Sequence, residues 1–169
     1  MNLFSLALVM TCAACVADSA ASTQDQLCAE KATLPGGSVQ LGLGSQFTPI
    51  TDGDTVESVL GLQGLWMFVT NVRAQDMHLG SDSLQGIVVL DAKDAMGTQV
   101  SLETGCHIRE FADGGDGYMY LTAVFLLPVS PNYPNDLEGM PLTVSLSLHD
   151  QEGHYASDTH TIIAHFPGR

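Results

Sequence analysis

Apolar and polar side chains alternate one by one along residues 142–149. Leu142, Val144, Leu146 and Leu148 are separated by Thr, Ser and His residues. A period of two places alternate side chains on opposite faces of a β-strand, whereas a helix needs a period near 3.6. Residues 161–166 repeat the pattern after a turn at 150–153, with Ile162, Ala164 and Phe166 on the apolar face. Matching the two apolar faces requires an odd-numbered loop, because a slip of one residue exposes every Leu.

The same period recurs upstream and predicts about eight or nine strands. Val39, Leu41 and Leu43 alternate with polar residues or Gly, and the run 65–69, which contains Trp66, is apolar on both faces and is predicted to be central. No ten-residue segment after position 20 carries a helical apolar stripe. We therefore predict an all-β, immunoglobulin-like two-sheet sandwich over residues 38–169, with a closed barrel as the alternative.

Two connections in this sandwich are distinctive. The Gly-rich loop 112–116 is predicted to join strands 107–111 and 117–127 as a hairpin. Residues 128–141 contain four prolines and are predicted to form a long loop. In the strand after the Gly-rich loop, either Tyr118 and Tyr120 or Met119 and Leu121 face the core, and the alternation leaves both choices open.

The N-terminal segment has a different composition. Residues 3–14 are uncharged and largely apolar. They are too short to span a bilayer, which takes about 20 residues, but they fit the apolar region of a signal peptide. A buried helix is the alternative, although the polar stretch that follows offers it little to pack against. We predict a signal peptide over 1–14 and a tether over 15–37.

The end of this segment, Cys12-Ala13-Ala14-Cys15, resembles the lipobox of bacterial lipoproteins. The resemblance implies that Cys15 is lipidated and, because Val16 rather than Asp follows, that the protein is sorted to the outer membrane. Cys12 stands where lipoboxes usually have Leu. Cleavage before Cys12, and ordinary signal-peptide cleavage near residues 17–20, are the alternatives.

The number of cysteines is consistent with export of the protein. Removal of residues 1–14 leaves Cys15, Cys28 and Cys106. Lipidation of Cys15 leaves an even number of thiols in an oxidising compartment, which predicts a Cys28–Cys106 disulfide. Two free, buried thiols are the alternative.

The charge balance excludes several partners. The chain has 5 Lys and Arg against 19 Asp and Glu, a net charge of −14. The cations are scattered, whereas nucleic acids and anionic lipid surfaces are bound by clustered Lys and Arg. We therefore predict no nucleic-acid partner, and a membrane contact only through the lipid anchor.

Several short motifs in residues 39–66 resemble a pattern in uncharacterised exported lipoproteins of Gram-negative bacteria. The pattern comprises Leu41-Gly42-Leu43-Gly44, Phe47, Asp52-Gly53-Asp54, Gly61-Leu62-Gln63-Gly64 and Trp66. The last hairpin is similar to that of bacterial immunoglobulin-like modules. The resemblance covers most of residues 39–166 and implies a surface β-sandwich, without implying any catalytic residue.

One group of carboxylates in the sequence could bind a metal ion. The six histidines show no metal-ligand spacing along the chain, so no transition-metal site and no cofactor are predicted. Glu110, Asp113 and Asp116 bracket two glycines and form a speculative calcium site. The alternative is that these Asp and Gly residues only make a hairpin turn.

No catalytic motif is present: the chain lacks a nucleophile elbow, a zinc-protease helix motif, a phosphate-binding loop and a dinucleotide fingerprint. We expect a non-catalytic, lipid-anchored module of the cell envelope. Its outer-membrane anchor would leave it facing the periplasm or the cell surface, and it would bind an envelope protein or a glycan. A secreted hydrolase whose carboxylates converge only in the fold, and a calcium-stabilised adhesive domain, are the alternatives.

Overall fold

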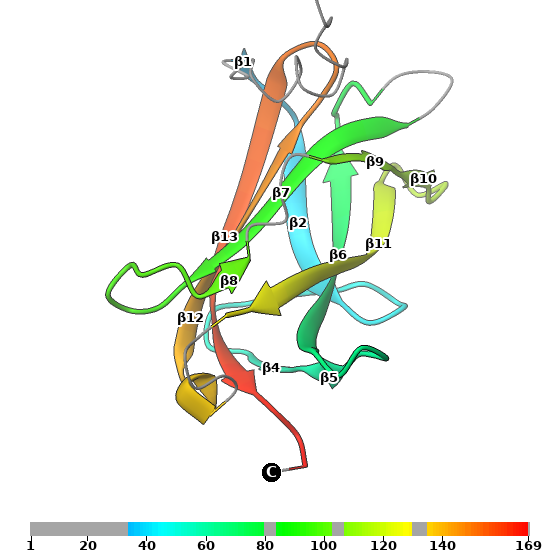
Figure 1. Ribbon diagram of the computed structural model, residues 1–169. Helices are drawn as coiled ribbons and strands as arrows, with labels where there is room; N and C mark the ends of the chain where they lie inside the picture. Colours follow the sequence, from blue (N-terminus) through cyan, green and yellow to red (C-terminus); the bar gives the residue numbers. More distant parts are fainter. Residues whose placement is uncertain (1–33, 80–83, 103–106, 130–134, 169) are drawn as a thin grey trace, which may run out of the picture.

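The computed structural model describes residues 34–79, 84–102, 107–129 and 135–168, and these form two facing β-sheets (Figure 1). The strands are β1 (Leu34–Pro35), β2 (Ser38–Leu43), β3 (Thr48–Pro49), β4 (Thr55–Glu57), β5 (Val59–Leu60), β6 (Trp66–Gln75), β7 (Gln85–Lys93), β8 (Ser101–Leu102), β9 (His107–Glu110), β10 (Ala112–Asp113), β11 (Met119–Pro128), β12 (Pro141–His149) and β13 (His154–His165). The fold is therefore all-β, as predicted.

The strand order is that of an immunoglobulin-like sandwich. One sheet runs β1-β13-β12-β7-β9, with β4 also paired to β13. The other runs β10-β11-β6-β2-β3, with β5 on β6 and β8 on β11. The orders β2-β6-β11-β10 and β7-β12-β13 match the two sheets of the immunoglobulin fold. The predicted two-sheet sandwich is confirmed.

The last hairpin, β12–β13, presents a continuous apolar face to the core. Leu142, Val144, Leu146 and Leu148 of β12 are all at most 1% exposed. The register pairs Leu148 with Ala156, and the Asp150 N–H donates to the His154 carbonyl at 3.0 Å. Residues 151–153 form the tip, an odd-numbered loop, so the apolar faces of β12 and β13 coincide as predicted.

The apolar run at 65–69 begins the central strand of the second sheet. β6 lies between β11 and β2, and its inward side chains, among them Phe68 and Val72, are fully buried. Trp66 is half-buried and packs edge-on against Phe166, with ring centroids 6.1 Å apart. The core therefore joins the start of β6 to the residue that follows β13.

The hairpin predicted around the Gly-rich loop is corrected. β9 pairs with β7 in the other sheet, so strand 107–111 does not pair with strand 117–127. The chain crosses between sheets at Phe111, which is buried, and the two-residue β10 then pairs with β11. Burial of the Phe111 ring between the sheets is the physical reason for the crossing.

A β-bulge settles which face of β11 is buried. Met119 and Leu121 pack against the core, so Tyr118 and Tyr120 face outward. The register with β6 shifts between Leu121 and Val124, and Ala123 adopts a φ of 58°. The extra residue reverses the alternation, which is why Val124 and Leu126 are also buried.

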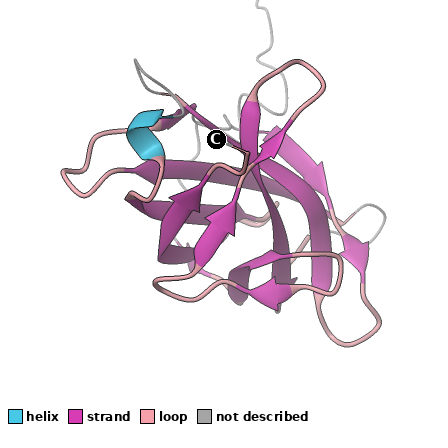
Figure 2. Cartoon of the chain, turned by 90° about the horizontal axis from the view of Figure 1, so that it is seen from below, coloured by secondary structure: helices cyan, strands magenta, loops and turns pink. Residues whose placement is uncertain are grey.

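The long proline-containing connection before β12 carries a short helical turn. A 3₁₀ turn spans Asn135–Leu137 (Figure 2), and its Leu137 side chain is buried. Among the residues that the structure describes, none forms a helix long and apolar enough to cross a membrane.

The outer edge of β13 is covered at both ends. β1, which lies within the predicted tether, pairs in parallel with Leu34 opposite His154. β4 pairs in parallel at the other end, with Thr55 opposite Ile163. The sandwich thus takes in residues from 34 onward, whereas the predicted signal peptide lies outside the described residues.

Candidate functional site

The outer face of the second sheet carries three aromatic rings around one arginine. Phe47 and Tyr120 meet edge to face with ring centroids 5.8 Å apart, and Tyr118 lies 6.4 Å from Tyr120. The Arg73 guanidinium lies 4.6 Å from the Phe47 ring centre and 4.4 Å from that of Tyr118. We call these four residues the aromatic platform.

Two glycines make room for the rings. A Cβ at Gly42 would lie 2.6 Å from the Phe47 ring, and a Cβ at Gly114 would lie 2.3 Å from the Tyr120 ring. Both distances are far below van der Waals contact, so any larger residue at these positions would displace the ring. Gly42 is predicted to lie in a strand and Gly114 in a hairpin loop, and in the structure each leaves space for a ring of the platform.

Arg73 is held from the side as well as by the rings. Its Nε donates to Oε1 of Gln40 on the neighbouring strand β2 at 2.7 Å. A guanidinium between aromatic faces gains cation–π attraction, and the side-on hydrogen bond fixes its plane. The platform is therefore preorganised.

A carboxylate borders the platform. The Tyr120 hydroxyl donates to Asp116 Oδ2 at 2.7 Å. This hydrogen bond raises the pKa of Tyr120, and it is the main reason that the pKa of Asp116 lies below its usual value. At neutral pH the tyrosine is protonated and the carboxylate is charged, so this rim offers hydrogen-bond acceptors.

Asn71 links the turn after β2 to the bulge of β11 beside the platform. Its Nδ2 donates to the Gly44 carbonyl at 2.7 Å, and its Oδ1 accepts from the Ala123 N–H of the bulge at 2.9 Å. A hollow of about 370 Å³ lies here, lined by residues that include Phe47, Asn71, Asp116, Tyr120 and Thr122. Its walls combine flat apolar rings with amide, hydroxyl and carboxylate groups.

The speculative calcium residues lie in and near the adjoining turn. Asp113 Oδ1 accepts from the Gly115 N–H at 2.8 Å, and Asp116 Oδ1 accepts from the Tyr118 N–H at 3.1 Å. Among the described residues, Glu110, Asp113 and Asp116 do not gather as one set of metal ligands. The bonds favour a turn-forming role. The calcium site stays a prediction, testable as a calcium-dependent melting shift that Asp113→Asn abolishes.

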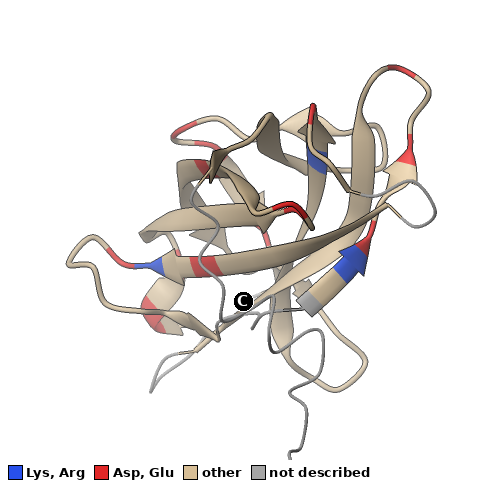
Figure 3. Ribbon diagram, turned by 90° about the horizontal axis from the view of Figure 1, so that it is seen from above, with Lys and Arg blue, Asp and Glu red and all other residues tan. Residues whose placement is uncertain are grey.

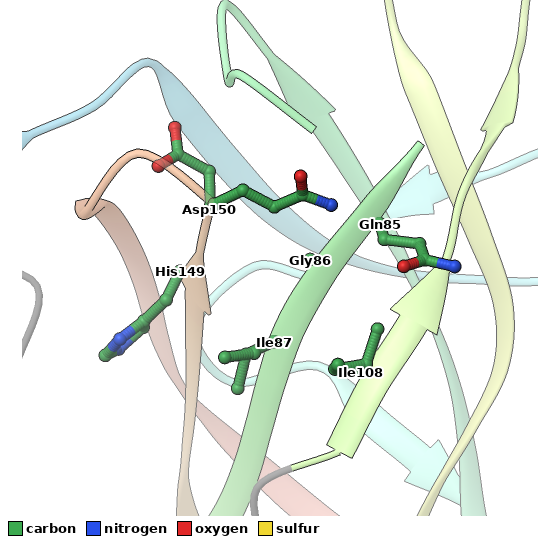
Figure 4. A pocket seen from close by; sticks show the side chains of 7 residues that line it. Gln85, Gly86, Ile87, Ile108, His149 and Asp150 are labelled. Carbon is green, nitrogen blue, oxygen red and sulfur yellow. The ribbon is translucent and has the colours of Figure 1, made fainter. Parts of the chain in front are cut away.

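A second hollow, of about 290 Å³, lies at the end of the first sheet where β7 and β9 meet the β12–β13 turn (Figure 4). Ile87 and Ile108 lie side by side in it, while the Asp150 carboxylate points away from them. Burial lowers the pKa of His149 beside this hollow, and the nearby Asp150 charge opposes that shift only in part. His149 is therefore mainly neutral at pH 7.

A third hollow, of about 310 Å³, is almost entirely apolar. Its lining includes Leu62, Leu65, Met67, Phe125 and Leu127. It lies beside the short strand β5 on the outer face of the second sheet. Gln63 is the one polar side chain in its lining, so this hollow has fewer groups to orient a ligand than the platform has.

Charged side chains are dispersed over the molecule. Figure 3 shows Asp and Glu on several separate loops, and Lys and Arg at isolated positions. Of the five cations, Arg73 is part of the platform, while Lys93 and Arg109 lie on β7 and β9.

The cysteines assigned to lipidation and to the disulfide, Cys15, Cys28 and Cys106, lie outside the described residues. Of the histidines, His165 lies 3.0 Å from Glu138, and His160 lies 3.0 Å from Asp158. Sequence reasoning did not anticipate the aromatic platform. Phe47 comes from a turn, Arg73 from β6, Tyr120 from β11 and Tyr118 from the residue before β11, and no spacing along the chain brings them together.

Comparisons with known proteins give no family. No family model matches the chain, and no curated protein matches it. Among solved structures, the N-terminal domain of PorA is similar over 74% of this chain and 97% of that chain, with 12% identity and a TM-score of 0.29. The candidate site therefore rests on its own geometry.

Proposed function

We propose that the protein is a non-catalytic binding module of the cell envelope and that it holds a glycan on the aromatic platform. The observation that carries the proposal is a rigid set of rings beside a hollow whose polar groups are fixed by hydrogen bonds. Tyr rings offer apolar area together with a polar handle. The Asp116 carboxylate and the Asn71 amide supply acceptors and a donor for hydroxyl groups.

The platform is better suited to an uncharged sugar than to a charged peptide. Arg73, whose guanidinium contacts the Phe47 ring in the lining of the hollow, is already engaged by two rings and by Gln40. The exposed rim is acidic through Asp116, which disfavours anionic ligands. A sugar ring stacked on Tyr118 or Tyr120 would direct its hydroxyl groups toward Asp116.

The test is NMR titration of the full chain with a panel of neutral and N-acetylated oligosaccharides. We expect shift changes at Phe47, Tyr118 and Tyr120, and loss of about tenfold or more in affinity for Tyr120→Ala, as for removal of a central aromatic contact. Tyr155→Ala is the matched control, because Tyr155 is an exposed tyrosine on β13. No shift with any sugar, or equal loss in the control, would refute the proposal.

We further propose that the module is exported and tethered by a lipid on Cys15, with a Cys28–Cys106 disulfide. Support comes from the apolar segment 3–14, the lipobox-like Cys12-Ala13-Ala14-Cys15 and the even count of remaining thiols. Intact mass of protein from native membranes tests this. We expect a chain beginning at Cys15 with three acyl chains, gaining two protons on reduction. An unlipidated chain beginning near residue 20 would contradict the anchor.

A further inference from the structure

Two histidines and a glutamate from distant parts of the chain meet at the β12–β13 turn. His78 follows β6, Glu152 lies at the turn and His154 begins β13. His78 Nδ1 lies 3.3 Å from Glu152 Oε2, and the two imidazole rings are 5.2 Å apart. One donor atom from each of the three residues lies within 4.8 Å of the others.

The buried carboxylate of Asp150 holds the backbone of this cluster in place. The side chain of Asp150 is 0% exposed. It accepts the backbone N–H groups of His78 at 3.1 Å, and of Glu152 and His154 at 2.9 Å. One carboxylate therefore fixes the backbone of all three neighbours, which gives the cluster a preset geometry.

Asp150 also orients one of the imidazoles. His154 Nδ1 lies 3.0 Å from Asp150 Oδ2. In the tautomer that donates from Nδ1 to the carboxylate, the Nε2 lone pair is left to coordinate a metal ion. A carboxylate behind a histidine is the usual arrangement around protein-bound transition metals. His78 and Glu152 are 64% and 62% exposed, so water can complete the coordination.

We propose that His78, Glu152 and His154 form a binding site for a first-row transition-metal dication such as Zn²⁺, with Asp150 as the positioning residue. Imidazole nitrogens favour Zn²⁺, Cu²⁺ or Ni²⁺, whereas Ca²⁺ and Mg²⁺ prefer all-oxygen sets. Tetrahedral zinc requires ligand atoms about 3.4 Å apart. Rotation of the exposed His78 and Glu152 side chains would be needed to bring the ligand atoms, now within 4.8 Å of one another, to that spacing. The site is separate from the aromatic platform.

The experiment is calorimetric titration of the full chain with ZnCl₂, in parallel with CaCl₂. We expect one Zn²⁺ per chain and no calcium binding at the same concentrations. His78→Gln and His154→Gln should each weaken zinc binding at least tenfold. His165→Gln should leave it unchanged, because His165 also has a carboxylate partner, Glu138 at 3.0 Å, but no place in the cluster.

A second readout separates ligation from stability. With Cu²⁺ as the probe, electron paramagnetic resonance should report two nitrogen ligands in the native chain and one in His78→Gln, whose exposed position leaves the fold unchanged by circular dichroism. Absence of zinc binding would overturn the proposal. Zinc binding that survives both cluster variants would also overturn it, since the ion would then be held elsewhere in the chain.

Discussion

At the scale of single residues, Asp150 is the clearest case of a polar group on which local structure depends. Burial alone would raise its pKa, but hydrogen bonds from His154, His78 and Glu152 outweigh burial and hold the pKa below its usual value. The bonds therefore favour the charged form. A carboxylate in the middle of a turn is easily read as a solvated hairpin residue, and the sequence contains no sign that this one is buried.

We predict that Asp150→Asn lowers the free energy of unfolding by about 2 kcal/mol at pH 7, because hydrogen bonds to a charged acceptor are lost. Since the folded pKa lies below the unfolded value of about 3.9, the contribution is complete above that value. It is lost as pH falls through the folded pKa.

Urea unfolding of both proteins between pH 7 and pH 3 measures this. The difference between native chain and variant should shrink as the solution is acidified. Asp91→Asn, on the half-exposed face of β7, is the control and should cost less than about 0.5 kcal/mol. A cost for Asp150→Asn that is constant with pH would count against the charged carboxylate as its cause.

The histidine cluster illustrates what residue spacing cannot reveal. His78 and His154 are 76 positions apart in sequence, and they meet because the segment after β6 and the start of β13 lie side by side. Spacing arguments detect ligands that share one strand or helix. They do not detect ligands that meet because two turns are stacked by the packing of other strands. The aromatic platform was missed for the same reason, since Phe47 comes from a turn near β3 and Arg73 from β6.

At the scale of the strands, alternation was a reliable guide wherever a strand had one buried face. The register of β12 and β13 followed from the positions of Leu and Ile alone. The alternation failed in β11, where one extra residue at the bulge lets Leu121 and Val124 both face inward. Alternation also did not predict that β9 pairs with β7. The four residues of β9 are compatible with either sheet, and burial of Phe111 determines which sheet they join.

At the bulge we predict that a substitution to glycine stabilises the protein. Ala123 adopts a φ of 58°, a region that costs a residue with a Cβ about 1–2 kcal/mol. We expect Ala123→Gly to raise the free energy of unfolding by about 0.5–1 kcal/mol, since relief of strain exceeds the added flexibility of the unfolded chain.

Ala112→Gly provides the comparison, because Ala112 is also exposed but does not have a positive φ. It should destabilise the protein by about 0.5–1 kcal/mol. Denaturant titration of the two variants and the native chain measures the pair. Equal destabilisation by both substitutions would show that the bulge is unstrained.

A side chain of β13 closes the open edge between the two sheets. Asp158 Oδ2 accepts the Leu41 N–H of β2 at 2.8 Å, although β2 belongs to the opposite sheet. Leu41 is fully buried. We predict that Asp158→Ala costs about 1–3 kcal/mol, because the Leu41 N–H would lose its acceptor.

The neighbouring exposed residue Ser157 is the control for this substitution. Ser157→Ala should change the unfolding free energy by less than about 0.5 kcal/mol. Hydrogen exchange provides a second measure: the Leu41 amide should exchange faster in Asp158→Ala and at the native rate in Ser157→Ala. Unchanged exchange at Leu41 would mean that Asp158 does not protect it.

At the scale of the whole molecule, charge is the dominant property. A net charge of −14 on 169 residues opposes compaction through self-repulsion. Salt screens this repulsion, as the Debye length falls from about 30 Å at 0.01 M to about 8 Å at 0.15 M. We predict that the melting temperature rises between 10 mM and 150 mM NaCl, as calorimetry would show. A fall would indicate that attractive ion pairs outweigh the repulsion.

The parallel pairing of β1 with β13 has a mechanical consequence. The Leu34 N–H donates to the Gly153 carbonyl and the Gly36 N–H to that of Tyr155. If the chain is tethered through its N-terminal side, a pull along β1 loads these two bonds in shear, because parallel strands drawn toward opposite ends slide past each other. The force reaches first the turn that carries Glu152 and His154. Tension on the tether and a metal ion at the proposed site would then both act on the β12–β13 turn.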